Sequence, residues 1–316
     1  MTIAIGASGP HAGLAIFKAL QAAEAVGEGA IRGFVMLAVI TRDRQLARFE
    51  TQRGGTQTLF TDGEVTGAEP PAAVREAIAA ALISSGPDRP VPLSQFLTAD
   101  AQAGLVTAHR VPQGPSIKGI PLNVEVLEAL QSGKSAQAAT ETVLSQNPFA
   151  DVGFITIDRH GSLHLQNVPR VQKRPDVGMA YRENVDAGAK LAVLHNAIVP
   201  HTSLAALVAD IGWQQMVAVD PITGWFTLAA GVPIIHGEVD AVEIDGQGRA
   251  QKVVTSDHTF TDRDRSGVGI YLHSLVRQHG KVLGKTLFEP ICVVRDGRIL
   301  TMSGQTSLRM SYTHCP

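Results

Sequence analysis

Apolar and polar positions alternate over the first residues of the chain, and the period then changes. Ile3 and Ile5 alternate with smaller residues from Thr2 onward, as in a β-strand, and a Gly-Ser-Gly turn follows. Beyond the turn, Leu14, Phe17 and Leu20 recur at the spacing of one helix face. This pattern predicts a strand, a glycine turn and an amphipathic helix at the start of the chain.

The same criteria predict elements along the rest of the chain. Strands are expected at residues 34–41, 45–51, 58–60, 104–109, 153–158, 162–166, 226–228, 238–244, 250–255, 291–295 and 299–302. Helices are expected at residues 72–84, 122–131, 203–211 and 271–279, and from the N-cap Ser135 to Asn147-Pro148. Residues 168–183 are charged and irregular, which indicates a long functional loop or an internal boundary. Because helices and hairpins occur in blocks, the order favours a layered α+β fold over a doubly wound parallel α/β sheet, which is the alternative.

Composition narrows the function classes. The chain has 316 residues, a formal charge of −2 and no basic cluster, so we expect no nucleic-acid partner. It has no apolar run of membrane-spanning length and no signal-peptide pattern, which predicts a cytoplasmic protein without a membrane partner. Cys292, Cys315 and the scattered histidines lack metal-ligand spacing, so no metal is expected, and Cys292 is predicted to be a core residue. These observations are compatible with a homo-oligomer.

Thr2 is the first candidate for chemistry. A small second residue favours removal of Met1, which would leave a hydroxyl and a free α-amine on the same residue. An unperturbed α-amine has a pKa of about 8 and can act as the base that activates its own hydroxyl. The strand that begins at Thr2 would bury such a nucleophile. Thr2 is therefore a candidate N-terminal nucleophile.

A stretch further along the chain strengthens this interpretation. Residues 104–161 contain a Gly-Leu-Val-Thr strand, a loop with Gly114, the segment Gly133-Lys134-Ser135-Ala136, a helix ending at Asn147-Pro148, and Ile157-Asp158 with Gly161. With the Met-Thr start, this order resembles an uncharacterised bacterial family of N-terminal-nucleophile (Ntn) hydrolase-like proteins. The resemblance covers about half of the chain, Met1 and residues 104–166.

The resemblance implies a four-layer αββα sandwich and hydrolysis of a small amide by Thr2, without a cofactor. We expect a single domain over residues 1–316, with the core in residues 1–170 and residues 171–316 completing the sandwich. Backbone N–H groups or an asparagine would hold the oxyanion. The candidates for this role, or for binding substrate, are Arg53, Gly54, Gly55, Thr107, His109, Lys118 and Asn167.

Two other functions stay open at this point. Gly6, Gly9 and Gly13 follow a strand and open a helix, and Asp43 lies after the next strand, as in the phosphate turn and ribose-binding acid of an NAD(P)-dependent oxidoreductase. Pro10 and His11 stand in the turn where the backbone would approach phosphate, which disfavours this alternative. The other possibility is a non-catalytic ligand-binding protein of Ntn fold that retains Met1.

Overall fold

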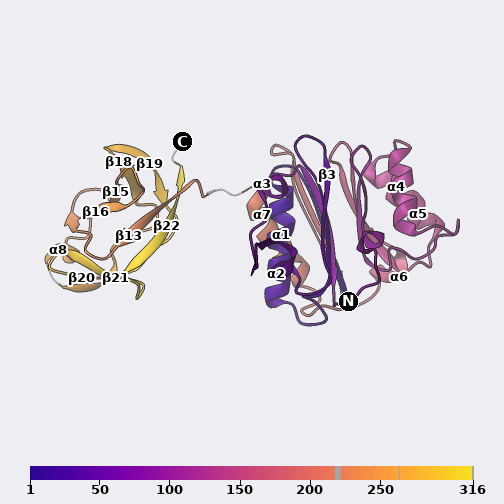
Figure 1. Ribbon diagram of the computed structural model, residues 1–316, viewed down its shortest axis with the longest axis horizontal. Coiled ribbons are helices and arrows are strands. Elements are labelled where there is room, and N and C mark those ends of the chain that lie inside the picture. The colour runs from indigo at the N-terminus through magenta and orange to yellow at the C-terminus, as the bar shows by residue number, and fades with distance from the viewer. Residues whose placement is uncertain (218–221, 263, 315–316) are drawn as a thin grey trace. The chain divides into compact units, whose positions relative to one another are not determined.

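The computed structural model describes residues 1–217, 222–262 and 264–314, and it divides the chain into two compact units (Figure 1). The first unit ends at Ala218 and the second begins at Val219. The prediction of a single domain does not match this division. Residues 171–217 belong to the first unit, whereas residues 222–314, which were also expected to complete the sandwich, form a core of their own from strands and one short helix.

The first unit is built around a six-stranded sheet with β1 near its centre. Every strand pairs antiparallel with its neighbours. In spatial order the strands are β11 (Val177–Asn184), β12 (Ala189–Asn196), β1 (Thr2–Ser8), β6 (Ala79–Ser85), β2 (Val35–Ile40) and β3 (Leu46–Thr51). All residues of β1, β6 and β2 are buried, which explains their nearly continuous small and apolar sequences.

A four-stranded antiparallel sheet packs against one face of the larger sheet. Its strands, in spatial order, are β10 (Leu163–Asn167), β9 (Val152–Asp158), β8 (Gly104–Arg110) and β7 (Thr98–Asp100). Fully buried side chains from both sheets, among them Ala4, Leu105, Ile155 and Leu194, form the apolar layer between them. Gly6 lies in this layer, where an added Cβ would stand 2.6 Å from Cγ2 of Ile155. A glycine there allows β1 and β9 to approach closely.

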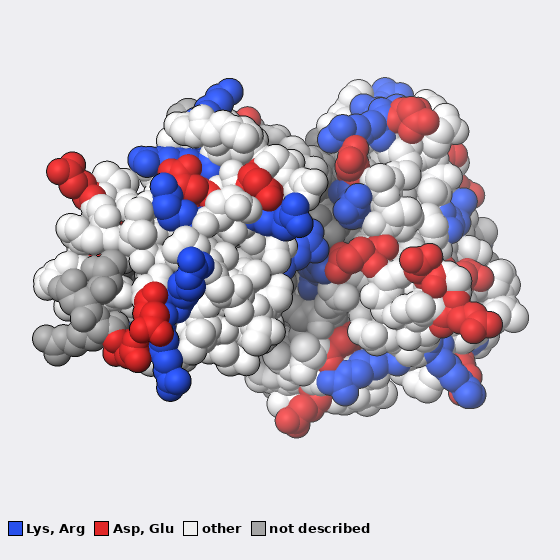
Figure 2. Space-filling view, turned by 60° about the vertical axis from the view of Figure 1, so that its left-hand side comes forward, with Lys and Arg blue, Asp and Glu red and all other residues white. Residues whose placement is uncertain are grey.

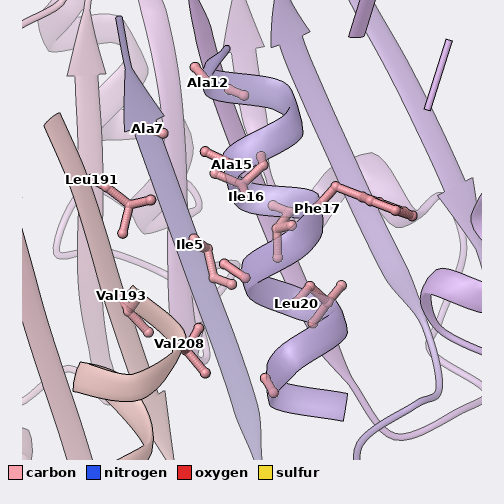
Figure 3. Close-up of a cluster of buried hydrophobic side chains, with 14 of the residues drawn as sticks. Ile5, Ala7, Ala12, Ala15, Ile16, Phe17, Leu20, Leu191, Val193 and Val208 are labelled. Atoms are coloured by element: carbon pink, nitrogen blue, oxygen red, sulfur yellow. The ribbon is translucent and has the colours of Figure 1, made fainter. Parts of the chain in front are cut away.

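Helices cover the outer faces of both sheets, so the first unit has the order helix, sheet, sheet, helix (Figure 1). The helices α1 (Ala12–Val26) and α7 (Leu204–Met216) cover the six-stranded sheet, and α4 (Leu122–Gln131) and α5 (Ala136–Gln146) cover the four-stranded one. Figure 3 shows α1, with Phe17 and Leu20, in the same cluster of buried apolar side chains as Ile5 and Val193 of the sheet. The first unit is therefore a mixed α+β fold with antiparallel sheets, and its sheets exclude the doubly wound alternative.

Short elements connect these layers. They are α2 (Thr56–Leu59), β4 (Thr61–Asp62), β5 (Val65–Thr66), α3 (Ala72–Arg75), a 3₁₀ turn (Leu93–Phe96) and α6 (Pro169–Gln172). The last of these and β11 occupy residues 168–183, so the irregular loop predicted there is wrong for much of its length.

The second unit consists of a seven-stranded and a three-stranded sheet. The larger sheet has the order β13 (Gly224–Ala229), β22 (Ser307–His314), β19 (Lys281–Thr286), β18 (Leu275–Gln278), β15 (Ala241–Ile244), β16 (Ala250–Thr255) and β14 (Ile234–His236). The smaller has the order β17 (Arg265–Val268), β20 (Ile291–Arg295) and β21 (Arg298–Met302), and α8 spans Thr259–Asp262. Cys292 is fully buried in this core, as predicted, and burial raises the pKa of its thiol to about 11.

Two predicted helices are strands in the structure. Residues 72–84 contain only the four-residue α3, and the alanine-rich run that follows is β6, which lies between β1 and β2. Alanine favours helices, but a central strand buried on both faces also takes small apolar residues, so periodicity does not distinguish the two. Residues 271–279 contain β18 rather than a helix. In both places long-range pairing overrides local propensity.

Candidate active site

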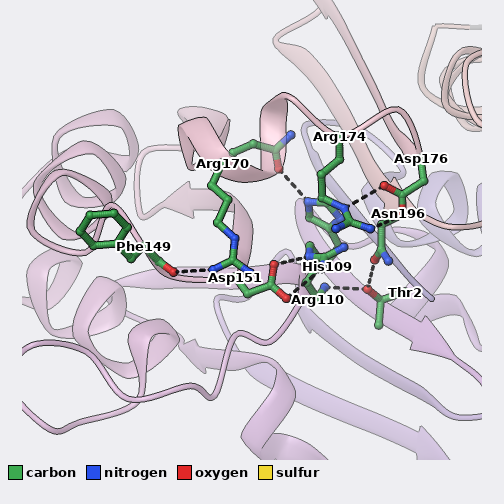
Figure 4. A network of polar contacts seen from close by, with 10 residues as sticks. Thr2, His109, Arg110, Phe149, Asp151, Arg170, Arg174, Asp176 and Asn196 are labelled. Atoms are coloured by element: carbon green, nitrogen blue, oxygen red, sulfur yellow. Dashed lines mark hydrogen bonds and ion pairs between the residues drawn. The ribbon is translucent and has the colours of Figure 1, made fainter.

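Four strand ends meet around Thr2. Thr2 begins β1, and its neighbours in the sheet are Ser85, the last residue of β6, and Asn196, the last residue of β12. Arg110 ends β8 in the facing sheet, and its backbone N–H donates a hydrogen bond of 2.6 Å to Thr2 Oγ1. Thr2 Oγ1 in turn donates to Asn196 Oδ1 at 2.7 Å (Figure 4). The hydroxyl of a residue that is only 8% exposed is thus held between one donor and one acceptor.

A cavity of about 270 Å³ opens beside this hydroxyl. One part of its wall is apolar, and the other carries guanidinium, carboxylate and amide groups. Its lining residues are Met1, Thr2, Phe34, Ile83, Arg89, Phe96, Arg110, Val111, Gln113, Asp151 and Asn196. The buried Oε1 of Gln113 has no hydrogen-bond partner among the described residues. This small, partly polar cavity is suited to a small molecule with hydrogen-bonding groups.

A row of side chains on the four-stranded sheet lies behind Asn196. His109 of β8, Gly153 of β9 and Asn167 of β10 occupy paired positions on adjacent strands. The His109 ring crosses Gly153, and its Nε2 lies 2.7 Å from Asn167 Oδ1. Burial lowers the pKa of His109 to about 4, and the amides of Asn167 and Asn196 oppose this shift. His109 is therefore neutral at physiological pH.

Two ion pairs lie near Thr2, and the residues of the first, Arg110 and Asp151, line the cavity. Arg110 donates from Nε to Asp151 Oδ1 at 2.5 Å and from Nη2 to Oδ2 at 2.8 Å. This pair holds Arg110 in place, and the backbone N–H of the same residue contacts Thr2. The hydrogen bonds from Arg110 hold the pKa of the Asp151 carboxyl below its usual range. Arg174 and Asp176 form a second bidentate pair with distances of 2.8 and 3.0 Å. Figure 4 shows both pairs close to Thr2.

The amino terminus lies at the same place. Burial lowers the pKa of the Met1 α-amine, and the positive charges of Arg89 and Arg110 lower it further, whereas Asp176 has the opposite effect. An α-amine in this environment is more readily deprotonated than in water, and its lone pair is then available to accept a proton.

The structure brings some of the predicted site residues together. His109 and Asn167 bond to each other. Asn196 accepts a hydrogen bond from Thr2 Oγ1 and also raises the pKa of the His109 imidazole, so it lies between Thr2 and this pair. Thr107 faces the larger sheet but donates to the carbonyl of Leu82 at 2.8 Å, so it links the two sheets instead of lining the cavity.

Four other predicted residues do not join the site. The N–H groups of Gly54 and Gly55, expected as oxyanion donors, donate to the carbonyls of Arg32 and Gly33. The Arg53 guanidinium is exposed and pairs with Asp88. Lys118, expected as a substrate clamp, pairs with the buried Glu125 at 2.7 Å. None of the four lines the cavity.

The glycines of the proposed dinucleotide turn pack against protein atoms. Gly6 lies inside β1 rather than in a turn. A Cβ at Gly9 would stand 2.5 Å from the carbonyl oxygen of Gly188, and one at Gly13 only 1.9 Å from that of Val74. Asp43 accepts a hydrogen bond from Thr41 Oγ1. These contacts explain the glycines without a bound phosphate.

Several residues at the site were not predicted from the sequence. Asn196, Ser85 and Arg110 reach Thr2 only through strand pairing and the stacking of the sheets, and Arg89 reaches the cavity from the loop after β6. One signal was available, because Ser85, Arg110 and Asn196 are polar residues at the ends of apolar segments.

The surface carries charged side chains of both signs. On the face drawn in Figure 2, Lys and Arg side chains are interspersed with Asp and Glu, and neither sign covers a large continuous area.

Within residues 1–217, 222–262 and 264–314, no group of three or more His, Cys, Asp or Glu side chains is arranged to hold a metal ion. No helix in the same part of the chain has both the length and the apolar character needed to span a membrane.

Comparison with known proteins identifies two families. A family model described as Domain of unknown function (DUF6963) matches residues 2–225, and one described as Domain of unknown function (DUF7259) matches residues 231–307. No curated protein matches the chain. The two matches follow the two compact units closely. Because the first match covers more than half of the sequence, the chain belongs to the DUF6963 family.

Proposed function

We propose that this member of the DUF6963 family is an amidohydrolase of the Ntn type that cleaves a small amide, with Thr2 as its nucleophile after Met1 is removed. The observation that carries the proposal is the position of Thr2 Oγ1. Thr2 begins β1, near the centre of the larger sheet, and it lines the cavity. Its Oγ1 accepts a hydrogen bond from the Arg110 N–H and donates one to the Asn196 side chain. The order of helix and sheet layers in the first unit supports the same interpretation.

The base in this mechanism is the α-amine of Thr2. Removal of Met1 would place the amine one residue further into the sheet, near the same Arg89 and Arg110 charges that act on the Met1 amine. Burial and adjacent cations both favour the neutral amine. A neutral amine on the same residue as the hydroxyl can accept the hydroxyl proton without a histidine.

The site also contains donors for negative charge. The Arg110 N–H points at Thr2 Oγ1 and would stabilise charge that develops on this oxygen as its proton leaves. The Asn196 side chain, already bonded to Oγ1, also carries an amide NH₂ that can donate to the oxyanion of the tetrahedral intermediate. His109 and Asn167 bond to each other near Asn196, and because His109 is buried and neutral it does not serve as the base in this scheme.

The reaction then takes two stages. Oγ1 attacks the amide carbonyl carbon and its proton moves to the α-amine, and the resulting ammonium gives this proton to the departing amine as the C–N bond breaks. The acyl group is left as an ester on Thr2. Water attacks this ester with the α-amine as base, and the carboxylic acid and the free hydroxyl are released.

The test starts from the intact mass of untagged protein from its native source, which should lack one methionine. The mature protein is then screened for release of primary amine from small amides. Thr2→Ala should abolish turnover and Thr2→Ser should retain part of it. All three residues at position 2 are small, so removal of Met1 should be unaffected in the variants. Unchanged turnover in Thr2→Ala would exclude Thr2 as the nucleophile.

A non-catalytic binding protein is the second candidate, and one observation favours it. Met1 lines the cavity, and its Sδ accepts a hydrogen bond from the Ala30 N–H at 3.1 Å. In this alternative Met1 is part of the binding site and its amine is displaced from Oγ1 by one residue. A native protein that keeps Met1 and cleaves none of the amides, but binds them saturably, would support this alternative over the hydrolase.

A further inference from the structure

Arg89 is the unpaired cation of the cavity. In the described part of the chain, the other lining guanidinium, that of Arg110, is neutralised by Asp151, and Arg89 has no carboxylate within ion-pair distance. Arg89 follows β6 in a loop and is half-buried, and the structure holds it in place instead of leaving it in solvent. A half-buried guanidinium that is held in place without a counter-ion can bind an anionic group of a ligand.

Four contacts fix the position of Arg89. Its guanidinium lies over the Phe34 ring, 5.9 Å from the centroid, and its Nη2 donates to Ser85 Oγ. Its backbone N–H donates to Gln52 Oε1 at 2.9 Å, and its carbonyl accepts from Gln52 Nε2 at 2.7 Å. An arginine has five N–H donors, and only one of those on this side chain is occupied within the described residues. The others are available to a ligand.

The position of Arg89 relative to the nucleophile is set by strand register. Ser85, which orients the guanidinium, is directly opposite Thr2 in the pairing of β1 with β6. Residues opposite each other in antiparallel strands have Cα atoms about 4.5–5.5 Å apart. The Arg89 charge also acts on the amino terminus. An anionic group on Arg89 would therefore lie within the length of one small molecule from Thr2 Oγ1.

The remaining walls favour the same kind of ligand. Arg110 and Asp151 cancel each other, so the lining side chains carry one net positive charge, on Arg89. The walls contributed by Phe34, Ile83 and Phe96 are apolar, which strengthens an ion pair formed beside them. Gln113 contributes a buried Oε1 without a partner among the described residues, which can accept an N–H from an amide.

We infer that the substrate is a small amide that carries a carboxylate, and that Arg89 binds this carboxylate while the amide carbonyl lies at Thr2. The inference rests on the proposed function. Arg89 is a specificity-determining residue in this scheme, because its planar guanidinium can form two parallel hydrogen bonds with a carboxylate.

The test separates binding from turnover. Full-length mature Thr2→Ala protein, which binds without cleaving, is titrated by calorimetry with N-acetylglycine, N-acetyl-β-alanine and N-acetyl-4-aminobutyrate, each compared with its neutral primary amide. The series varies the distance between amide and carboxylate. At least one acid should bind about tenfold or more tightly than its amide, as expected for hydrogen bonds between charged groups.

Matched arginine variants assign the preference to one residue. Arg89→Gln in the same background should remove it, and Arg89→Lys, which keeps the charge but not the planar geometry, should leave part of it. Arg53→Gln is the control, because Arg53 is an exposed arginine that lies outside the cavity and pairs with Asp88. It should keep the full preference. The melting temperature of each variant shows that it is folded.

The outcomes distinguish the two proposals. No saturable binding of any acid, or a preference that persists in folded Arg89→Gln protein, would overturn the role of Arg89. Hydrolysis is measured separately in protein with Thr2 intact. Carboxylate binding that depends on Arg89, together with no amide turnover that depends on Thr2, would leave the anion site standing and refute the hydrolase.

Discussion

Gly153→Ala should disrupt the hydrogen bond between His109 and Asn167 near Thr2, although the change adds only a methyl group. A Cβ at position 153 would lie 1.8 Å from Asn167 Oδ1 and 2.6 Å from His109 Nε2, and real contacts of a Cβ are never so short. The two side chains that bond to each other across this glycine would both have to move. Because both are buried, neither can replace the lost hydrogen bond with bulk water.

The magnitude follows from three contributions. Breaking a buried hydrogen bond without replacing it costs about 1–3 kcal/mol. Forcing a methyl group into a packed interior costs about 1–3 kcal/mol more. The backbone of Gly153 is not in the left-handed region, so alanine offsets about 0.4–1 kcal/mol by restricting the unfolded chain. The expected net loss in the free energy of unfolding is about 1–5.5 kcal/mol.

Scanning calorimetry of the full chain measures this loss. Gly246→Ala is the control, since a Cβ there meets nothing within 4 Å, and it should change stability by no more than about 0.5 kcal/mol. If the clash with Asn167 is the cause, Gly153→Ala combined with Asn167→Ala should cost less than the sum of the two single changes. A Gly153→Ala protein as stable as the control would refute the contacts assigned to His109 and Asn167.

Two further predictions concern His195 and Asp151. Burial, followed by the charge of His201, lowers the pKa of His195 to about 4 from 6.5, so the unfolded chain binds this proton more tightly than the folded one. The stability that His195 contributes is therefore complete above pH 6.5 and is lost as the pH falls toward 4. The difference in unfolding free energy between wild type and His195→Asn should shrink by up to about 1 kcal/mol per pH unit in this window, and a constant difference would contradict the shift. Asp151→Asn should lower stability by about 1 kcal/mol and, by freeing the Arg110 guanidinium at the cavity, should tighten binding of the N-acetyl acids by calorimetry. Weaker acid binding in this variant would show that Asp151 does not neutralise Arg110.

Local signals in the sequence were sufficient where an element is delimited by its own residues. The expected strand at residues 34–41 is β2, and helix 122–131 is α4. Ser135 caps α5 by accepting from the Ala138 N–H, as its position before an apolar run predicts. The hairpin of β9 and β10 also agrees, because the turn residues between the strands mark it.

Signals were insufficient where tertiary contacts decide the outcome. Residues 79–85 are an alanine-rich strand only because β1 and β2 flank them. The N–H groups of Gly54 and Gly55 looked available for an oxyanion, but carbonyls from another segment of the chain occupy them. Of the predicted site residues, His109 and Asn167 do meet, yet their contact depends on a glycine in the intervening strand and on the register of three strands.

The rest of the site follows a rule that combines local and long-range information. In an antiparallel sheet, the residue that begins one strand lies beside the residues that end its neighbours. Thr2 begins β1, so the polar residues that end the adjacent strands, Ser85 and Asn196, must meet it. Each of them is the last residue of a strand that is mostly apolar, and its side chain lies beside the Thr2 end of β1. Strand order and register are not visible in a local pattern, and this is why Thr2 could be singled out from the sequence as a candidate whereas the residues that hold its hydroxyl could not.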